Sequence, residues 1–548
     1  MTAQSLIIGL DGADWDVIEA LGSDQLPTLH GLRATGTHAR LQSVQPPATL
    51  PNWTTFLTGV GPGAHGVFDF TIRNGYNVRF TGGSVREVPT VFSRLDRLGR
   101  RTACVAFPGT WPSEPLEHGV YISGWDAPVA FEADASYVWP RSLHASILRR
   151  FGALRFDTVD EFHADHSGWH DRLPQALEAR IEQKTALANW LLEQNAWHLF
   201  AVYFGESDTA SHYLWSLHDN QSPRRPGHCL ANQTDGLARI YRALDHSVAT
   251  LLQAAGGPDR VELTIVSDHG SGGSSDKALY LNRLLAEWGF LHFKPRTRLG
   301  PIANRAKQLA LDKLAPRVRH YLFEKASRRL PSMLESYARY GHIDMARTRI
   351  FSDELNYFPS LHFNLRGREP LGLLHPHDVP DMLRDLTRAL CAVRDPWSDE
   401  PVIKSVHERG ALFHGPFLHR APDLLLELHL DNGYSYNLLP SGSFRGEGAW
   451  RRLKAEEYLG KKGRSLPGSH RDHGVYLASG PRVRIRGECH LRMADAMGHV
   501  LSRLEPWVQL PDIPAPAPLG ISSRTRNSFT SSKEAQIAAR LRQLGYID

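Results

Sequence analysis

Short apolar runs alternate along the chain with longer segments of helical periodicity, and this alternation limits the folds available to it. The apolar runs lie at 5–10, 102–107, 198–204, 262–268, 423–430 and 474–479. Helical patterns include 176–196 and 236–255. Strands that alternate with helices favour a mostly parallel sheet covered by helices on both faces. We therefore expect an α/β fold: a three-layer α/β/α core around a mostly parallel central sheet, with an inserted cap or helical region.

The composition is ordinary for a globular protein and excludes several classes. The 548 residues are 41% hydrophobic and 22% charged, which suffices for a large core. The net charge of +5 fits an anionic substrate, but a balanced surface is the preferred explanation of so small a charge. No interleaving of basic and aromatic residues indicates nucleic-acid binding. The four cysteines form no CxxC pair, which argues against a disulfide framework or a thiolate zinc site.

The sequence shows no targeting or membrane-spanning segment. The apolar run Leu6–Leu10 is too short for a signal peptide. No stretch approaches the roughly 20 apolar residues of a transmembrane helix. We therefore expect a cytoplasmic location.

Changes in composition divide the chain into four parts. We predict the first part of a catalytic core at 1–292, a basic helical insertion at 293–345, a continuation of the core with a cap-like segment at 346–510, and a Pro-rich linker with a C-terminal helix at 511–548. The insertion carries eleven Lys and Arg residues between 294 and 329. A solvated helical insertion explains them, and a basic lid or a membrane-surface helix is the alternative.

Acidic and histidine residues gather where the predicted strands end. Asp11 follows the first strand, Asp208 follows the third, and Asp268 with His269 ends the fourth. Ligands of open α/β sheets bind just beyond the carboxyl ends of their strands. Asp208 and His212 are also spaced to share one face of a helix. Each motif has a structural alternative, such as an Asp-Gly turn at Asp11, but together they provide the oxygen and nitrogen ligands of a metal site.

Two further segments contribute polar side chains. Thr49 lies between Pro47 and Pro51, just before a helical stretch. A hydroxyl or phosphate at a helix N-terminus gains from the local positive potential, although a capping threonine is the simpler interpretation. His470 and His473 precede the last strand, and spacing alone does not choose between them.

The order of these motifs resembles that of the alkaline phosphatase superfamily. The matching motifs are LDG at 10–12, TLPN at 49–52, TGVGPGAHG at 58–66, DTASH at 208–212, DHG at 268–270 and GSH at 468–470. Within the superfamily, the chain is most similar to the type I phosphodiesterase/nucleotide pyrophosphatase family. The resemblance covers most of the chain and implies an alkaline-phosphatase-like core.

The resemblance also implies a role for each matching residue. One divalent cation would be held by Asp208, His212 and His470. A second would be held by Asp11, Asp268 and His269, with Thr49 bridging toward it. His470 is preferred to His473 because it occupies the Gly-x-His position. Zinc is the expected ion at both sites, with manganese or iron as alternatives.

The implied reaction is hydrolysis of a small phosphorus ester, most readily a phosphodiester, through a phosphorylated Thr49. A phosphomonoesterase, a phosphonate hydrolase and a phosphoryl transferase are alternatives that use the same site. A non-catalytic protein that binds phosphorylated ligands is disfavoured by the intact ligand set. Two residues depart from the nucleotide-cleaving pattern: Leu50 replaces an aromatic residue, and Phe70 replaces an asparagine. We expect Trp53, Phe70, Arg73 or Tyr213 to shape the substrate pocket.

Overall fold

The computed structural model describes residues 3–124, 135–154, 164, 166–227, 229, 231–295, 330–355, 359–442, 444, 446–460 and 465–504. Most of the predicted basic segment, the Pro-rich linker and the C-terminal helix lie outside these residues. The structure does not test the predicted domain boundaries or the cytoplasmic location, and both stay predictions.

A large, mostly parallel sheet forms the centre of the core lobe, as predicted. In spatial order its strands are β19 (Gly487–Glu488), β2 (Thr37–Gln42), β18 (His473–Ser479), β9 (Glu262–Val266), β1 (Ala3–Leu10), β8 (Trp197–Phe204), β5 (Thr102–Val105), β6 (Val120–Ile122) and β7 (Val138–Trp139), and β20 (Leu491–Arg492) also pairs with β2. Strand β1 is parallel to both β8 and β9. Its apolar run from Leu6 to Leu10 is buried, as expected of a strand covered on both faces.

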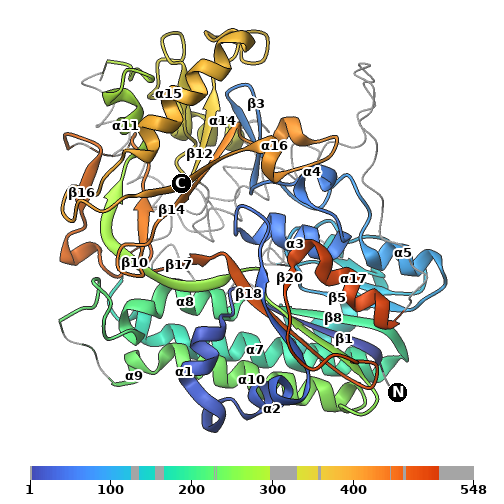
Figure 1. Cartoon of the computed structure of the whole chain (residues 1–548). Helices are drawn as coiled ribbons and strands as arrows, with labels where there is room; N and C mark the ends of the chain where they lie inside the picture. Colours follow the sequence, from blue (N-terminus) through green and yellow to red (C-terminus); the bar gives the residue numbers. More distant parts are fainter. Residues whose placement is uncertain are drawn as a thin grey trace.

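Helices cover both faces of this sheet (Figure 1). One face carries α1 (Trp15–Gln25), α2 (Pro27–Thr35), α7 (Trp169–Gln194), α8 (Glu206–His218) and α10 (Gly236–Ala255). The other carries α3 (Thr49–Thr58), α5 (Val91–Arg97) and α17 (Met493–Leu504). Helix α10 shows why: its buried apolar residues recur every three or four positions, at Leu237, Ile240, Leu244, Val248 and Leu251. The three-layer α/β/α prediction is confirmed.

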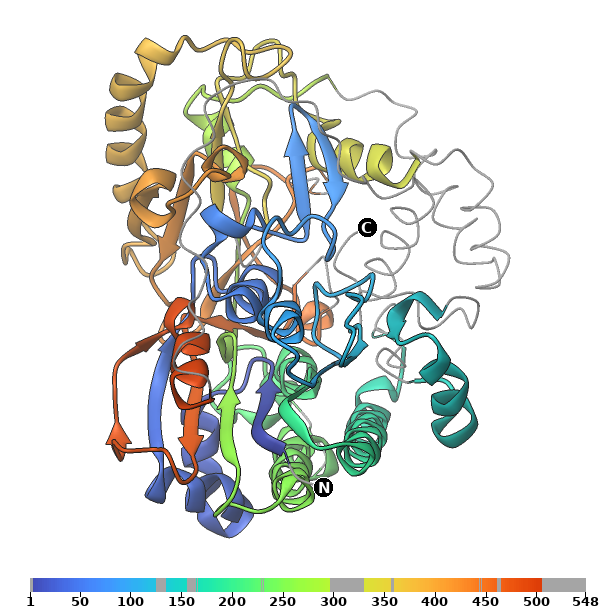
Figure 2. The same cartoon turned by 90° about the vertical axis from the view of Figure 1, so that its right-hand side faces the viewer.

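A second lobe has its own sheet and core (Figure 2). Its described part comprises residues 281–295, 330–355, 359–442, 444 and 446–450, together with the hairpin at 71–80. Its antiparallel sheet runs β11 (Ile350–Phe351), β12 (Ser360–Phe363), β14 (Leu424–Leu428) and β13 (Ile403–Glu408). Around it lie the hairpin β3 (Thr71–Asn74) and β4 (Asn77–Phe80), and helices α11 (Leu281–Glu287), α14 (Leu330–Tyr340) and α15 (Val379–Cys391). The predicted strand at 423–430 therefore pairs within this second sheet and not within the central one. A local apolar pattern does not specify which strand it will pair with.

One long strand connects the lobes. Strand β10 (Gly270–Leu279) follows β9 and curves from the core lobe toward the second lobe (Figure 1). Its first half pairs with β17 (Gly468–Arg471), and its second half pairs with β15 (Ser435–Leu438) and β16 (Trp450–Arg452). β10 therefore brings residues near position 470 beside the end of β9.

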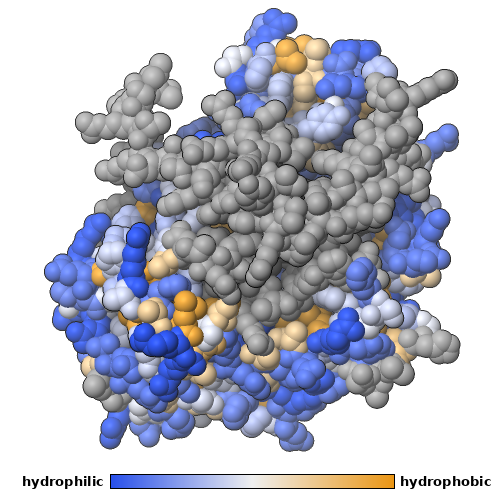
Figure 3. Space-filling view, turned by 180° about the vertical axis from the view of Figure 1, so that it is seen from behind, coloured by the Kyte–Doolittle hydropathy of each residue, from blue (hydrophilic) through white to orange (hydrophobic). Residues whose placement is uncertain are grey.

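On the face in Figure 3, the described residues are mostly hydrophilic, and hydrophobic residues form small scattered groups. Among the described residues, no helix combines the length and apolar character needed to cross a membrane.

Candidate metal centre

The predicted ligands meet beyond the carboxyl ends of three adjacent parallel strands. Asp11 follows β1, Asp268 and His269 follow β9, and Asp208 lies in the first turn of α8, just after β8. The pairing of Gly9 with both Tyr203 and Val266 sets these three strand ends level. The fold therefore converts residues far apart in sequence into one buried cluster.

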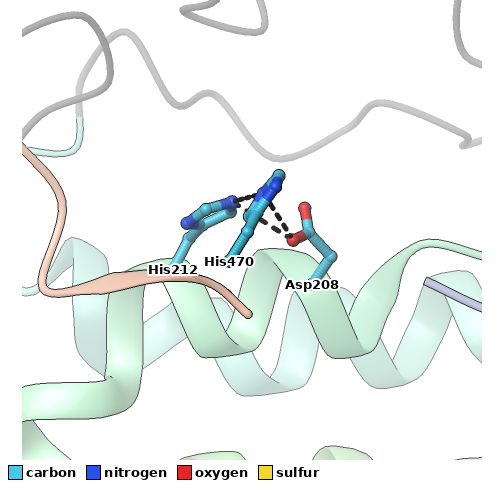
Figure 4. A group of neighbouring side chains, drawn as sticks. All are labelled: Asp208, His212 and His470. Carbon is cyan, nitrogen blue, oxygen red and sulfur yellow. Dashed lines mark hydrogen bonds and ion pairs between the residues drawn. The ribbon is translucent and has the colours of Figure 1, made fainter. Parts of the chain in front are cut away.

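The first group consists of Asp208, His212 and His470 (Figure 4). Asp208 and His212 project from one face of α8, and His470 approaches from β17. The Nε2 atoms of His212 and His470 lie 3.1 Å and 3.6 Å from Asp208 Oδ1. The two Nε2 atoms are 3.1 Å from each other. These ligand atoms are close enough to share one cation.

Backbone carbonyls fix which nitrogen of each ring faces the group. His212 Nδ1 lies 3.1 Å from Gly468 O, and His470 Nδ1 lies 2.6 Å from Pro47 O. A carbonyl only accepts hydrogen bonds, so each Nδ1 carries the proton and each Nε2 of the neutral ring presents a lone pair. Two lone pairs that face each other at 3.1 Å repel. A cation bound by both nitrogens would accept the two lone pairs and so remove the repulsion.

The second group consists of Asp11, Asp208 and His269, with Asp268 alongside. His269 Nδ1 donates to Gly270 O over 2.9 Å, so its Nε2 is again the free lone pair. This Nε2 lies 3.4 Å from Asp11 Oδ1 and 3.3 Å from Asp268 Oδ2. All three atoms are buried and have no hydrogen-bond partner. Such orphaned ligand atoms fit a second cation, and Asp208 belongs to both groups.

The carboxylates of the cluster oppose one another electrostatically. Burial and the charge of Asp208 raise the pKa of Asp11. Burial and the charges of Asp11 and Asp208 raise the pKa of Asp268 well above its usual range. Burial lowers the pKa of His470 well below its usual value, so this ring stays neutral. Added positive charge would relieve the repulsion.

Two glycines allow the close backbone approaches that the cluster needs. Gly12 has a φ of +62°, and its N–H donates to Asp268 Oδ1 over 3.2 Å. A Cβ at Gly468 would lie 2.0 Å from Ser211 O, so β17 could not approach α8 with any other residue there. These contacts give the LDG and Gly-x-His motifs a structural reason.

Thr49 is the first residue of α3, and contacts on both sides hold it near the cluster. Two residues earlier, Pro47 O accepts from His470. Four residues later, Trp53 Nε1 donates to Asp11 Oδ2 over 2.9 Å. The Asn52 amide donates to the carbonyls of the preceding loop and so fixes the entry into the helix. The first turn of α3 is therefore tied to His470 before Thr49 and to Asp11 after it.

A histidine of the TGVGPGAHG motif holds the same helix in place. His65 Nε2 lies 3.0 Å from Thr55 Oγ1, and Val67 N donates to His65 Nδ1 over 3.1 Å. Burial lowers the pKa of His65 to about 3. His65 is therefore a neutral residue that fastens α3 to the segment after it.

The four predicted pocket residues occupy different surroundings. Trp53 is buried against Asp11. Tyr213 is buried and packs edge-on against Trp169. Arg73 lies on β3 in the second lobe and pairs with Glu369. Phe70 is half-buried at the edge of the main core. Their surroundings differ, and their contact with a substrate stays a prediction.

Sequence reasoning did not identify Tyr203, whose hydroxyl donates to Asp11 Oδ2 over 2.6 Å. Tyr203 lies inside an apolar strand pattern, where an aromatic residue is expected as core. Only the register of β8 against β1 places its hydroxyl beside Asp11.

His473, the other candidate in the last segment, begins β18 and is exposed, outside both ligand groups.

Comparison with known proteins agrees with this architecture. A phosphonoacetate hydrolase from Sinorhizobium meliloti, solved with phosphonoformate, has 14% identity and a TM-score of 0.53, and the match covers 92% of this chain and 96% of that one. The murine ectonucleotide pyrophosphatase/phosphodiesterase 5 has 13% identity and a TM-score of 0.47, with 93% and 96% covered. The likeness to the phosphonoacetate hydrolase concerns the fold alone.

Sequence comparison is more specific. A venom phosphodiesterase from Macrovipera lebetinus is 28% identical over 138 residues, which are 25% of this chain and 13% of that protein. Residues 5–441 match the type I phosphodiesterase/nucleotide pyrophosphatase family, whose members are phosphoric ester hydrolases. The match spans most of the chain and includes every predicted ligand except His470. The chain therefore belongs to the type I phosphodiesterase/nucleotide pyrophosphatase family.

Proposed function

We propose that this protein hydrolyses phosphate esters, phosphodiesters faster than monoesters, at a site that holds two divalent cations. The proposal rests on the two adjacent groups of Asp and His residues, which share Asp208. In both groups, imidazole lone pairs and carboxylate oxygens face one another. Zinc is the proposed ion, because the ligands are imidazoles and carboxylates without thiolates. The match to a venom phosphodiesterase supports the preference for diesters.

Thr49 is the proposed nucleophile. Its Oγ attacks phosphorus, the ester oxygen leaves, and Thr49 carries the phosphoryl group until water hydrolyses it. When bound, the two cations lower the pKa of the attacking hydroxyl and stabilise charge on the entering and leaving oxygens. The N-terminus of α3 adds a positive potential at the phosphoryl group. The hydrogen bond of His470 to Pro47 keeps this turn beside the ligands.

A substrate panel tests the reaction type. The purified, zinc-loaded protein should cleave bis(p-nitrophenyl) phosphate faster than p-nitrophenyl phosphate. Phosphonoacetate belongs in the panel, because a phosphonoacetate hydrolase shares the fold. A monoester or phosphonate rate above the diester rate would reverse the proposed order. Product transfer to an added alcohol would indicate a transferase.

Substitution of Thr49 tests the mechanism. Thr49→Ala should abolish turnover and keep the cation content, whereas Thr49→Ser should retain part of the activity. Thr58→Ala is the matched control, because Thr58 lies at the other end of α3 and its hydroxyl donates to Thr54 O within the helix. Residual turnover in Thr49→Ala equal to that of Thr58→Ala would exclude Thr49 as the nucleophile.

A further inference from the structure

The two carboxylate oxygens of Asp11 have different surroundings. Oδ2 accepts two hydrogen bonds, from Trp53 Nε1 at 2.9 Å and from the Tyr203 hydroxyl at 2.6 Å. Oδ1 is buried, accepts no hydrogen bond and lies 3.4 Å from His269 Nε2. Both donors are neutral, buried side chains, so they orient the carboxylate without cancelling its charge.

Trp53 belongs to the same helix as Thr49, four residues later, so the two share one face of α3. Its indole N–H therefore joins the helix that carries the proposed nucleophile to a proposed cation ligand on the sheet. Tyr203 reaches the same oxygen from β8 and has no part in α3. The two donors thus hold Asp11 from two separate elements.

The indole ring has little freedom to move. It packs edge-on against Phe56, Phe107 and Tyr203, with ring centroids 5.9, 5.2 and 5.4 Å away. A Cβ at Gly9 would lie 2.8 Å from Trp53 Cη2, so β1 leaves room for the ring at this position. Close packing of this kind locks the rotamer of a supporting residue.

We propose that Trp53 and Tyr203 are positioning residues that present Asp11 Oδ1 to the cation site, and that Trp53 also sets the distance between Asp11 and the first turn of α3. This inference rests on the two-cation site proposed above. On this proposal, Trp53 orients the cation ligand Asp11, whereas the sequence had led us to expect it in the substrate pocket. Loss of such an outer partner typically weakens metal binding by about 10–100-fold.

Four variants test the proposal: Trp53→Phe, Tyr203→Phe, their combination, and Trp197→Phe as a control. Tyr203→Phe removes only the hydroxyl donor, whereas Trp53→Phe removes the indole donor together with part of the ring. Trp197 is also buried, and its Nε1 donates to Leu191 O over 2.9 Å, so its variant measures the loss of an indole hydrogen bond elsewhere in the core. Zinc affinity is measured for each by competition with a chromophoric chelator, and folding by circular dichroism.

We expect Trp53→Phe and Tyr203→Phe each to weaken one of the two zinc sites by at least about tenfold and to leave the other unchanged. At saturating zinc, Tyr203→Phe should recover the wild-type kcat on bis(p-nitrophenyl) phosphate. Trp53→Phe should keep a lower kcat, because α3 is no longer tied to Asp11. Trp197→Phe should match wild type in both measurements.

Two results would overturn the inference and leave the proposed function standing: both variants bind two zinc ions as tightly as wild type, or Trp197→Phe weakens binding equally. If Trp53→Phe fails to fold, Tyr203→Phe decides the claim about Asp11 by itself. A wild-type protein that binds no zinc would overturn the proposed function, and the inference with it.

Discussion

Two buried clusters, one in each lobe, compensate their carboxylates in opposite ways. In the second lobe, Asp395 is buried and accepts from Lys277 Nζ over 2.7 Å, and Asp431 lies 2.9 Å from the same ammonium group. In the core lobe, Asp11, Asp208 and Asp268 converge, and the basic groups that pair with them are imidazoles. The cluster around Asp395 contains its own positive charge, on Lys277. In the cluster around Asp208, imidazole lone pairs and carboxylate oxygens face one another.

This difference separates a structural network from a binding site. A buried carboxylate is stable only when a cation or several donors compensate it. Lys277 supplies that cation from within the chain. At the strand ends the compensation has to come from outside, which is why the core-lobe cluster is proposed to hold metal ions. The contrast predicts that similar substitutions in the two clusters have opposite consequences.

The largest expected effect is on activity. Asp208→Asn should lower kcat/KM by several orders of magnitude and reduce zinc at both sites, because Asp208 belongs to both ligand groups. Activity assays and metal analysis by mass spectrometry check this. Asp395→Asn serves as the comparison and should keep its zinc. A fully active, zinc-loaded Asp208→Asn protein would remove the distinction between the lobes.

The next effect is on stability in the second lobe. Asp395→Asn should lower the free energy of unfolding by about 3–5 kcal/mol, because it leaves the buried Lys277 without its nearest counter-charge. The Tyr436 hydroxyl, which donates to the same oxygen over 2.8 Å, would also lose an acceptor. Urea unfolding measures the change. An unfolding free energy equal to that of wild type would show that Asp431 alone compensates Lys277.

An Asp→Asn substitution in the core-lobe cluster should change the free energy of unfolding in the opposite direction when cations are absent. In protein stripped by a chelator, Asp268→Asn should raise the free energy of unfolding by about 1–3 kcal/mol. The new amide can donate toward His269 Nε2, which lies 3.3 Å from Asp268 Oδ2, and it cannot carry the charge that burial makes costly at this position. Thermal unfolding in chelator and then in excess zinc checks this. Zinc should stabilise wild type more than the variant, and destabilisation of the variant in chelator would contradict the charge argument.

The smallest effect concerns the pH dependence of stability. Burial lowers the pKa of His65 to about 3, below the ordinary value of about 6.5. Because the unfolded chain binds the proton first, His65 stabilises the fold above about pH 6.5, and this contribution is lost as the pH falls toward 3.

His65→Gln should therefore be less stable than wild type by about 1–3 kcal/mol at neutral pH, and the difference should shrink on acidification. Urea unfolding in chelator between neutral and acidic pH measures it. His377→Gln, at an exposed position, is the control and should show no such trend. A difference that does not change with pH would mean that His65 acts through its packing alone.

Much of the core lobe could be predicted from local sequence. The apolar runs at 5–10 and 198–204 became β1 and β8 because their residues suit burial on both faces. The helical pattern at 236–255 became α10 with the same bounds. The pattern at 423–430 also formed a strand, but in the second sheet, because strand pairing depends on contacts that a local pattern does not contain.

The sequence by itself determined which residues could serve as ligands: the spacing of Asp208 and His212, the adjacent Asp268 and His269, and the motif order that identified the family. Only the tertiary structure decided how they meet. It placed Asp208 in both ligand groups, turned each Nε2 toward the cluster through a carbonyl at Nδ1, and set Trp53 and Tyr203 on one oxygen of Asp11. The physical reason is that hydrogen bonds between segments 42 to 423 residues apart depend on strand register and helix packing, which local composition does not encode.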